Sequence, residues 1–173
     1  TQMIINHVEL IRNLVNEFSA FARFPTADPK PCALAPIVEE TVALYREGHP
    51  DIVFSMRIDE DIPIMNVDRQ QIKQAMINLV DNAVSAIRQN GEINVTIYHD
   101  PILKMVRIEV ADNGMGISDD DKIRLFEPNF STKKSGMGLG LTIVNSIIMD
   151  HNGMISVQDN QPQGAKFVIE LPV

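Results

Sequence analysis

The sequence lacks the features that mark several common protein classes. One cysteine, Cys32, excludes an intramolecular disulfide and a cysteine-based zinc cluster. No apolar run approaches the ~18 residues of a membrane-spanning helix, and no signal peptide is recognisable. A net charge of −8 leaves no basic excess for general nucleic-acid binding, so we expect no nucleic-acid partner. There is no internal repeat and no low-complexity tract.

What is present fits an ordinary globular chain with a single core. Of 173 residues, 45% are hydrophobic and 22% are charged, and a chain of this length can bury one sizeable core. The chain begins at Thr1 inside a predicted helix. We therefore expect it to be a fragment of a longer protein.

The first 24 residues predict a long helix that packs on a partner. Apolar residues recur at alternating spacings of four and three, at Ile4, Val8, Ile11, Val15, Phe18 and Ala22. This is the pattern of a helix in a packed seam, and a lone helix of this kind is marginal in water. The partner is a missing preceding helix, a second copy of the chain, or both.

Prolines separate this helix from the rest of the chain. Residues 24–36 hold four prolines, which remove backbone donors and disfavour a helix in the residues before them. We therefore divide the chain into a helical segment over 1–24, a hinge linker over 25–35 and a folded domain over 36–173.

Within that domain the hydrophobic period switches between those of helices and strands. The predicted helices are 36–47, 68–88 and 139–150, and the predicted strands are 52–58, 92–98, 103–111, 154–158 and 165–171. Short connections join two strand pairs, which favours a mixed, mostly antiparallel sheet. With helices covering one face, the predicted fold class is a two-layer α/β (α+β) sandwich preceded by one long helix. The polar, glycine-rich residues 113–137 are predicted to form a functional lid or a mobile segment.

The end of the third predicted strand carries the first candidate site. Alternate positions of this strand are apolar, at Val106, Ile108 and Val110. Asp112 keeps the same parity, so its carboxylate faces the interior and needs a donor. Gly114 and Gly116 follow, and they allow another molecule to approach the backbone. The stretch predicts a socket for a flat ligand edge with an amino group, although Asp-Asn-Gly is also common in turns.

Two asparagines on the long helix form the second candidate. Asn78 and Asn82 are four residues apart, so they lie on one side of the helix at the border of its apolar stripe. Asparagine is a poor helix former. Either the two amides bond a neighbouring loop, or a carbonyl oxygen faces a cleft and ligates a hard cation such as magnesium.

A glycine run and a pair of phenylalanines complete the candidates. Gly136, Gly138 and Gly140 stand directly before a helix, where exposed N–H groups can cradle an anion. The run is neither a P-loop nor a dinucleotide fingerprint, and a flexible loop looks similar. Lys133 and Lys134 lie just upstream, as phosphate contacts or as solvated lysines. Phe126 and Phe130 either dock a partner or anchor the lid to the core.

Together these blocks resemble the nucleotide-binding domain of the histidine kinase and GHKL ATPase superfamily, which has the Bergerat fold. The matching blocks are Asn78–Ala83, Asp112–Gly116, Phe126–Phe130, Gly136–Leu141 and Gly164–Phe167. The likeness covers residues ~33–173, and the order of the first four of these blocks makes it specific. Residues 1–24 resemble the second dimerisation helix of nitrogen-regulation sensor kinases.

The resemblance implies a role for each matching position. Asp112 accepts the adenine amino group, Gly116 lets the base approach and Ile117 lines its pocket. Asn82 ligates Mg²⁺, with Asn78 beside it, and these two are the catalytic candidates. The other implied ATP contacts are Gly114, Phe130, Lys133, Gly136, Gly138, Leu139 and Gly140.

Three positions depart from the family pattern. ATP-hydrolysing members carry a glutamate as general base four residues before the magnesium ligand, and here that residue is Asn78. An amide cannot take a proton, which argues for transfer to another nucleophile over hydrolysis. The usual threonine of the second glycine block is Met137. None of the histidines, His7, His49, His99 and His151, lies in a His-Glu/Asp motif on a first dimerisation helix, where the family carries its phosphate acceptor.

The resemblance thus predicts the ATP-binding catalytic domain of a two-component sensor histidine kinase. It would bind Mg²⁺ and ATP or ADP, and transfer the γ-phosphoryl group to a histidine on a dimerisation helix outside this chain. The expected partners are that helix, a response regulator and a second copy in the full-length protein. We expect a cytoplasmic location, in a parent protein that can be membrane-anchored, and no autophosphorylation by this chain alone. The alternatives are a GHKL ATPase, a serine-kinase relative and a non-catalytic nucleotide-sensing module.

Overall fold

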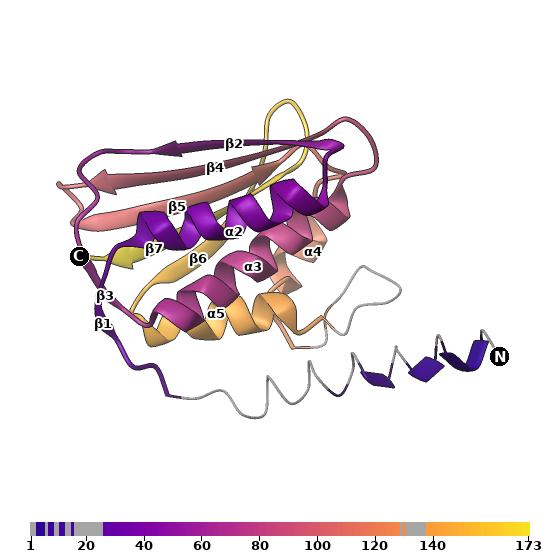
Figure 1. Ribbon diagram of the computed structural model, residues 1–173, viewed down its shortest axis with the longest axis horizontal. Coiled ribbons are helices and arrows are strands. Elements are labelled where there is room, and N and C mark those ends of the chain that lie inside the picture. The colour runs from indigo at the N-terminus through magenta and orange to yellow at the C-terminus, as the bar shows by residue number, and fades with distance from the viewer. Residues whose placement is uncertain are drawn as a thin grey trace.

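The computed structural model describes residues 26–128, 130 and 138–173, and near the N-terminus residues 3–5, 7–8, 11–12 and 15 (Figure 1). The described residues between 3 and 15 are helical. Their apolar side chains are exposed, namely Met3, Ile4, Ile5, Val8, Ile11 and Val15. Phe18 and Ala22 lie outside the described residues, so the predicted seam is described only in its first half.

A five-stranded sheet forms one layer of the domain, in the order β2-β4-β5-β7-β6. The strands are β2 (Ile52–Ile58), β4 (Gly91–Asp100), β5 (Met105–Asp112), β6 (Met154–Asp159) and β7 (Ala165–Pro172). β2 pairs with β4 in parallel, and the other three pairs are antiparallel. The mixed, mostly antiparallel sheet predicted from the sequence is confirmed.

Three helices form the second layer: α2 (Leu34–Gly48), α3 (Arg69–Ala86) and α5 (Gly140–Asp150). They lie side by side on one face of the sheet (Figure 1). Their apolar stripes and the inward side chains of the strands make a single core, in which Ile37, Leu79, Ile108 and Ile147 are at most 1% exposed. The predicted two-layer sandwich is confirmed, and its helical layer contains the candidate residues Asn78, Asn82 and Gly140.

The opposite face of the sheet is polar. Arg107 and Glu170 form an ion pair of 2.6 Å across β5 and β7, and the Tyr98 hydroxyl donates to Glu109 at 3.1 Å. These residues alternate with the buried ones along each strand, as a sheet with one solvated face requires. The helical side is therefore the buried side of this sheet.

Three short elements were not predicted. Strands β1 (Lys30–Cys32) and β3 (Met65–Val67) form a two-stranded antiparallel sheet, and α4 (Asp119–Arg124) lies inside the predicted lid. Three-residue strands show no readable period. β1 falls within the predicted 25–35 linker, so the end of that segment pairs with the domain. The signal for α4 was Ser118, whose hydroxyl accepts the Asp121 amide at 3.2 Å as an N-cap.

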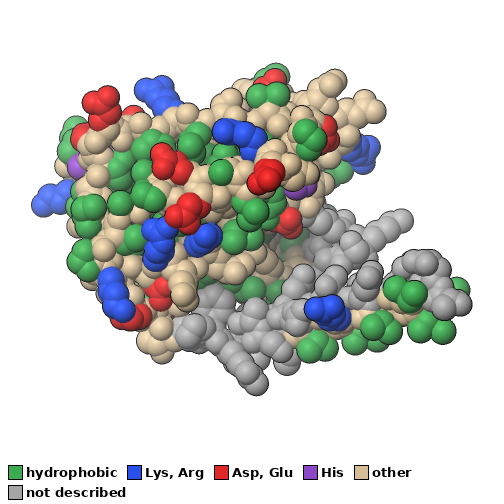
Figure 2. Space-filling view, in the orientation of Figure 1, with side chains coloured by type: hydrophobic (Ala, Val, Ile, Leu, Met, Phe, Trp, Pro, Cys, Tyr) green, Lys and Arg blue, Asp and Glu red, His purple; other side chains and the backbone are tan. Residues whose placement is uncertain are grey.

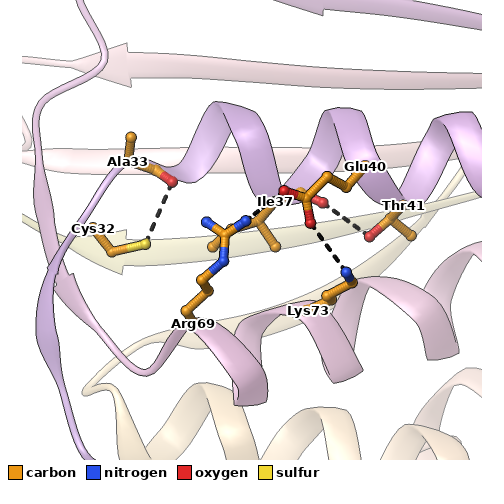
Figure 3. Close-up of polar contacts among 7 residues, drawn as sticks. All are labelled: Cys32, Ala33, Ile37, Glu40, Thr41, Arg69 and Lys73. Carbon is orange, nitrogen blue, oxygen red and sulfur yellow. Dashed lines mark hydrogen bonds and ion pairs between the residues drawn. The ribbon is translucent and has the colours of Figure 1, made fainter.

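Helices α2 and α3 are joined on their outer surface by one shared acid. Glu40 on α2 contacts Arg69 at 2.5 Å and Lys73 at 3.0 Å, both on the first two turns of α3 (Figure 3). All three side chains are nearly half exposed, so solvent screens these pairs and they orient the helices more than they stabilise them. On the face shown in Figure 2, acidic and basic side chains are interspersed. No helix in the described part of the chain has the length and apolarity to cross a bilayer.

Candidate functional site

Asp112 is the last residue of β5 and is buried, with 2% of its surface exposed. Its Oδ1 accepts two backbone hydrogens, from Gly114 N at 2.8 Å and from Ala165 N at 3.3 Å. Burial raises the pKa of this carboxyl, and the two amide hydrogens lower it in part. The inward carboxylate predicted from strand parity is confirmed.

The second carboxylate oxygen of Asp112, Oδ2, is a candidate acceptor for a ligand. Among the described residues no donor reaches Oδ2, because both hydrogen bonds go to Oδ1. A buried acceptor of this kind fits an exocyclic amino group at the edge of a flat ring. The socket predicted at this strand end therefore has its acceptor in place.

Close backbone packing shapes the turn after Asp112. A β carbon at Gly114 would lie 2.6 Å from the backbone oxygen of Ala86, at the end of α3. Gly116 has a φ of +74°, a conformation that favours glycine. Ile117 follows, half-buried against the core. Gly114 thus seats the turn against α3, while Gly116 and Ile117 lie beyond it.

The turn between β6 and β7 supports Asp112, and sequence reasoning missed this. Gly164 packs against the backbone oxygen of Asp112, and Asn160 Nδ2 donates to the same oxygen at 2.8 Å. Gln163 Nε2 donates to Gly114 O at 2.9 Å. The available signal is the Gln161-Pro-Gln-Gly164 stretch, whose last residue opens the matching block Gly164–Phe167.

A hollow of about 570 Å³ lies on the outer side of the same turn. Its lining residues are Ala86, Arg88, Gln89, Asn113, Gly114, Met115 and Gln163. Its side-chain amides at Asn113 and Gln163 are used within the protein. It shares only Gly114 with the predicted ATP contacts, so it is separate from the Asp112 carboxylate.

On α3 the side chain of the first candidate asparagine, Asn78, is bonded within the protein. Asn78 Nδ2 donates to Gly140 O at 3.2 Å, and Asn78 Oδ1 accepts from Gln74 Nε2 at 3.2 Å. The side chain therefore bonds a neighbouring backbone, which was one of the two alternatives for this pair. Asn82 lies one turn further along and is half-buried. Its role as a cation ligand stays a prediction.

The start of α5 faces Asn78. Leu139 is the N-cap residue and is buried, with 3% exposed. Gly138 has a φ of +68°, and a β carbon there would overlap the backbone oxygen of Phe130. At Gly140 nothing lies within 4 Å of the position of a β carbon among the described residues. Gly138 is thus required by the protein's own packing, while no described residue fills the position of a β carbon at Gly140.

Phenylalanines 126 and 130 are anchored to the domain. Both are half-buried against the core. The guanidinium of Arg124 lies 4.8 Å from the centre of the Phe130 ring, and Thr142 Oγ1 donates toward Phe126 O at 3.3 Å. Of the two alternatives for this pair, anchoring is the one observed. The candidates Lys133 and Gly136, together with Lys134 and Met137, lie outside the described residues.

The described residues contain no group of three or more histidine, cysteine or acidic side chains that could enclose a metal ion. A cage of protein carboxylates or imidazoles is therefore not present in this part of the chain. A magnesium ion held by one amide oxygen and by phosphate oxygens needs no such group. The half-buried amide of Asn82, on the helix beside the start of α5, suits that arrangement.

Residues 67–173 match the sequence family described as histidine kinase-, DNA gyrase B-, and HSP90-like ATPases. This match covers more than half of the chain and contains all the candidate residues named above. The chain belongs to this ATPase family.

Relatives of this ATPase domain include a nitrogen regulation protein and a histidine-protein kinase. The chain is 34% identical over 169 residues to the nitrogen regulation protein NtrY of Azorhizobium caulinodans, covering 95% of this chain and 22% of the relative. It is 30% identical over 173 residues to the signal transduction histidine-protein kinase AtoS of Escherichia coli, covering 99% of this chain and 28% of the relative. The chain thus spans between about a fifth and a third of these relatives.

Solved structures agree on the fold. The catalytic domain of histidine kinase ThkA has a TM-score of 0.76 and 34% identity, covering 84% of this chain and 95% of that one. ThkA in complex with the response regulator protein TrrA has a TM-score of 0.81 and 29% identity, covering 98% of this chain and 49% of that one. The ATPase domain therefore has the Bergerat fold of histidine kinase catalytic domains.

Proposed function

We propose that this chain binds ATP with Mg²⁺ and presents the γ-phosphoryl group to a histidine on a segment outside it. The observation that carries the proposal is the buried carboxylate of Asp112, with one oxygen bonded to the backbone and the other open. Asn78 on α3 lies beside Gly140 at the start of α5, so a side-chain amide and a helix N-terminus are neighbours in the helical layer. The ATPase family to which the chain belongs supplies the nucleotide class.

At the base end, Asp112 holds the adenine amino group through Oδ2. Its other oxygen is fixed by Gly114 N and Ala165 N, so the carboxylate is oriented before any ligand arrives. Gly116 presents backbone without a side chain, and Ile117 supplies an apolar wall. A ring with an amino edge is therefore held by one charge-assisted bond and by apolar contact.

At the phosphate end, Asn82 is the magnesium ligand and α5 supplies backbone N–H groups. The N-terminal turn of a helix carries partial positive charge that favours phosphate oxygens. No described residue lies within 4 Å of the position of a β carbon at Gly140, which supports the approach of a phosphate there. Lys133, Gly136 and Leu139 belong to this proposal as further phosphate contacts. Bound magnesium supplies charge neutralisation and orientation of the phosphates.

The chain's own residues favour transfer over hydrolysis. Asn78 occupies the place of a general base, yet its amide accepts no proton, and both ends of that amide are bonded within the protein. Without a base to activate water, the phosphoryl group needs a nucleophile supplied from elsewhere. Positioning and charge neutralisation then account for most of the rate.

The nucleophile is a histidine on a dimerisation helix outside this chain. His151 is 93% buried and both of its ring nitrogens are bonded to backbone, so it is not accessible as an acceptor. The relative AtoS is named a signal transduction histidine-protein kinase, and the structure of ThkA was solved in complex with the response regulator protein TrrA. We therefore propose a response regulator as the onward partner, a homodimer in the full-length protein and a location in the cytoplasm, where ATP is supplied.

A phosphorylation assay in trans tests the proposal. The chain is mixed with radiolabelled ATP, Mg²⁺ and a separate dimerisation segment that carries its histidine, taken from a related sensor kinase. Labelled, acid-labile phosphohistidine on the segment, absent without the chain, supports a kinase. Nucleotide binding with no label on the segment favours the non-catalytic module, and phosphate release without any segment favours the hydrolase.

A further inference from the structure

Helices α3 and α5 are joined by polar bonds at two points along their length. Near the middle of α3, Asn78 Nδ2 donates to Gly140 O, in the first turn of α5. At the other end, the backbone N–H of Asp68, which caps α3, donates to His151 Nε2 at 2.9 Å, just after the last turn of α5. The helices therefore run antiparallel, and each end of α5 is tied to α3.

The spacing between these two bonds is nearly equal on the two helices. Asp68 and Asn78 are ten residues apart on α3, and Gly140 and His151 are eleven residues apart on α5. At a rise of 1.5 Å per residue these separations are about 15 Å and about 16 Å. The two bonds form together only at one axial position of α5 against α3. A slide of one helix by a single turn, about 5 Å, would break both.

His151 is held in one orientation and one tautomer. Its ring is buried, and Nε2 accepts from the Asp68 amide, so Nε2 carries no proton. The proton is therefore on Nδ1, which donates to Ile147 O at 2.7 Å. A histidine that accepts at one nitrogen and donates at the other connects the two backbones rigidly.

Asp68 is itself fixed from several sides. Its Oδ1 accepts from Gln70 N and Gln71 N and caps α3, while Oδ2 accepts from Asp28 N at 3.0 Å. The partner of His151 is thus a rigid helix start and not a loop. Movement of the far end of α5 is restrained at this point.

We propose that His151 is a positioning residue for the phosphate end of the site. By setting the axial position of α5 against α3, it sets where the first turn of α5 stands relative to Asn82. This inference rests on the proposed function, and it assigns to a residue about 16 Å from Gly140 an effect on magnesium-dependent nucleotide binding. The Asp112 socket lies at the end of β5 and does not depend on this contact.

A matched pair of variants tests the inference. His151→Gln places an oxygen near the position of Nε2 and keeps an acceptor for the Asp68 amide. His151→Asn can still bond Ile147 O, but its shorter side chain does not reach that amide. Thr41→Val is the control for lost stability, because it removes a buried hydroxyl bond to Ile37 O within α2 (Figure 3). Calorimetry measures ADP affinity with and without Mg²⁺ on the full chain, below the unfolding temperature of every variant.

The expected result is a selective loss. His151→Asn reduces the gain in ADP affinity on adding Mg²⁺ by about tenfold, because misplacement of about 1 Å at such a site is costly. His151→Gln restores most of that gain, and Thr41→Val keeps it. The magnesium-free affinity stays within about threefold of the original in all three. Amide exchange at Asp68 is faster in His151→Asn and slow again in His151→Gln, which reads the bond directly.

Two contrary results separate this inference from the proposed function. A full magnesium-dependent gain in His151→Asn, with a rapidly exchanging Asp68 amide, overturns the positioning role and leaves the proposed function intact. An equal loss of magnesium-free and magnesium-dependent binding in both histidine variants also overturns it. If the unsubstituted chain binds no ADP at all, the proposed function fails and this inference fails with it.

Discussion

Gly164 and Asp112 are in direct backbone contact. Gly164 has a φ of +108°, and a β carbon on it would overlap the backbone oxygen of Asp112. The contact brings the start of β7 against the end of β5, where Ala165 N bonds the Asp112 carboxylate. The orientation of the proposed adenine acceptor therefore depends on the absence of a side chain 52 positions later in the chain.

Gly164→Ala is expected to damage both the fold and the site. The substituted residue must leave a left-handed backbone and push the β6–β7 turn away from Asp112, so we expect a loss of more than about 2 kcal/mol in the free energy of unfolding. Urea unfolding measures this loss, and ADP affinity should fall with it.

Gly48→Ala is the matched control for this change. A β carbon at Gly48 has nothing within 4 Å among the described residues, so we expect a change of less than about 1 kcal/mol. A Gly164→Ala chain as stable as the Gly48→Ala chain would show that the β6–β7 turn relaxes freely.

The sequence predicted the parts of the site that depend on local period. Asp112 could be placed inward because Val106, Ile108 and Val110 share its parity in a strand, and this needs no knowledge of the tertiary fold. Asp68 could be predicted as a helix cap from its position before an apolar period. The order of strands and helices along the chain followed from the same kind of local signal.

What could not be predicted depends on pairing between distant segments. The bonds from Asn160 and Ala165 to Asp112 span about fifty positions, and the bond from Asp68 to His151 spans 83. No period in either segment contains that information. Likewise, both alternatives for Asn78 were consistent with the sequence, and only the position of α5 decides that its amide bonds Gly140 O.

Asp112→Asn tests the adenine contact. The substitution keeps the shape of the side chain but replaces a carboxylate oxygen with an amide that donates or accepts depending on its orientation. We expect ADP affinity to fall by at least about tenfold, because a charge-assisted bond in a buried socket is lost. Calorimetry measures the affinity. Asp120→Asn, on the exposed side of α4, removes the same charge at a position away from the socket. This variant should leave the ADP affinity unchanged.

The same carboxylate predicts a pH dependence. Burial raises the pKa of Asp112 above its ordinary value, and the bonds from Gly114 and Ala165 offset this in part. A raised folded pKa adds stability that is fully present below the unfolded pKa and is lost as pH rises through the folded pKa. Nucleotide binding has the opposite sign, since the ionised form is the better acceptor. ADP affinity should therefore fall as pH drops through the raised pKa.

The measurement compares the pH profiles of ADP affinity for the original chain and for Asp112→Asn, between about pH 4 and pH 8. Subtracting the two profiles removes the titration of the nucleotide itself. The remaining step should lie above the ordinary pKa of an aspartate. Parallel profiles across this range would mean that the Asp112 carboxylate does not contact the base.

Asn82→Ala separates the metal ligand from the rest of the site. If the amide oxygen of Asn82 ligates magnesium, its removal should abolish the gain in ATP affinity on adding Mg²⁺ and leave magnesium-free ADP binding within about threefold, because the Asp112 socket is unchanged. Asn94→Ala, on the exposed face of β4, is the control for losing an asparagine. Calorimetry with and without Mg²⁺ gives both quantities. A magnesium gain that survives in Asn82→Ala would place the ligand on another residue, and Asn78, already bonded at both ends of its amide, would be a poor substitute.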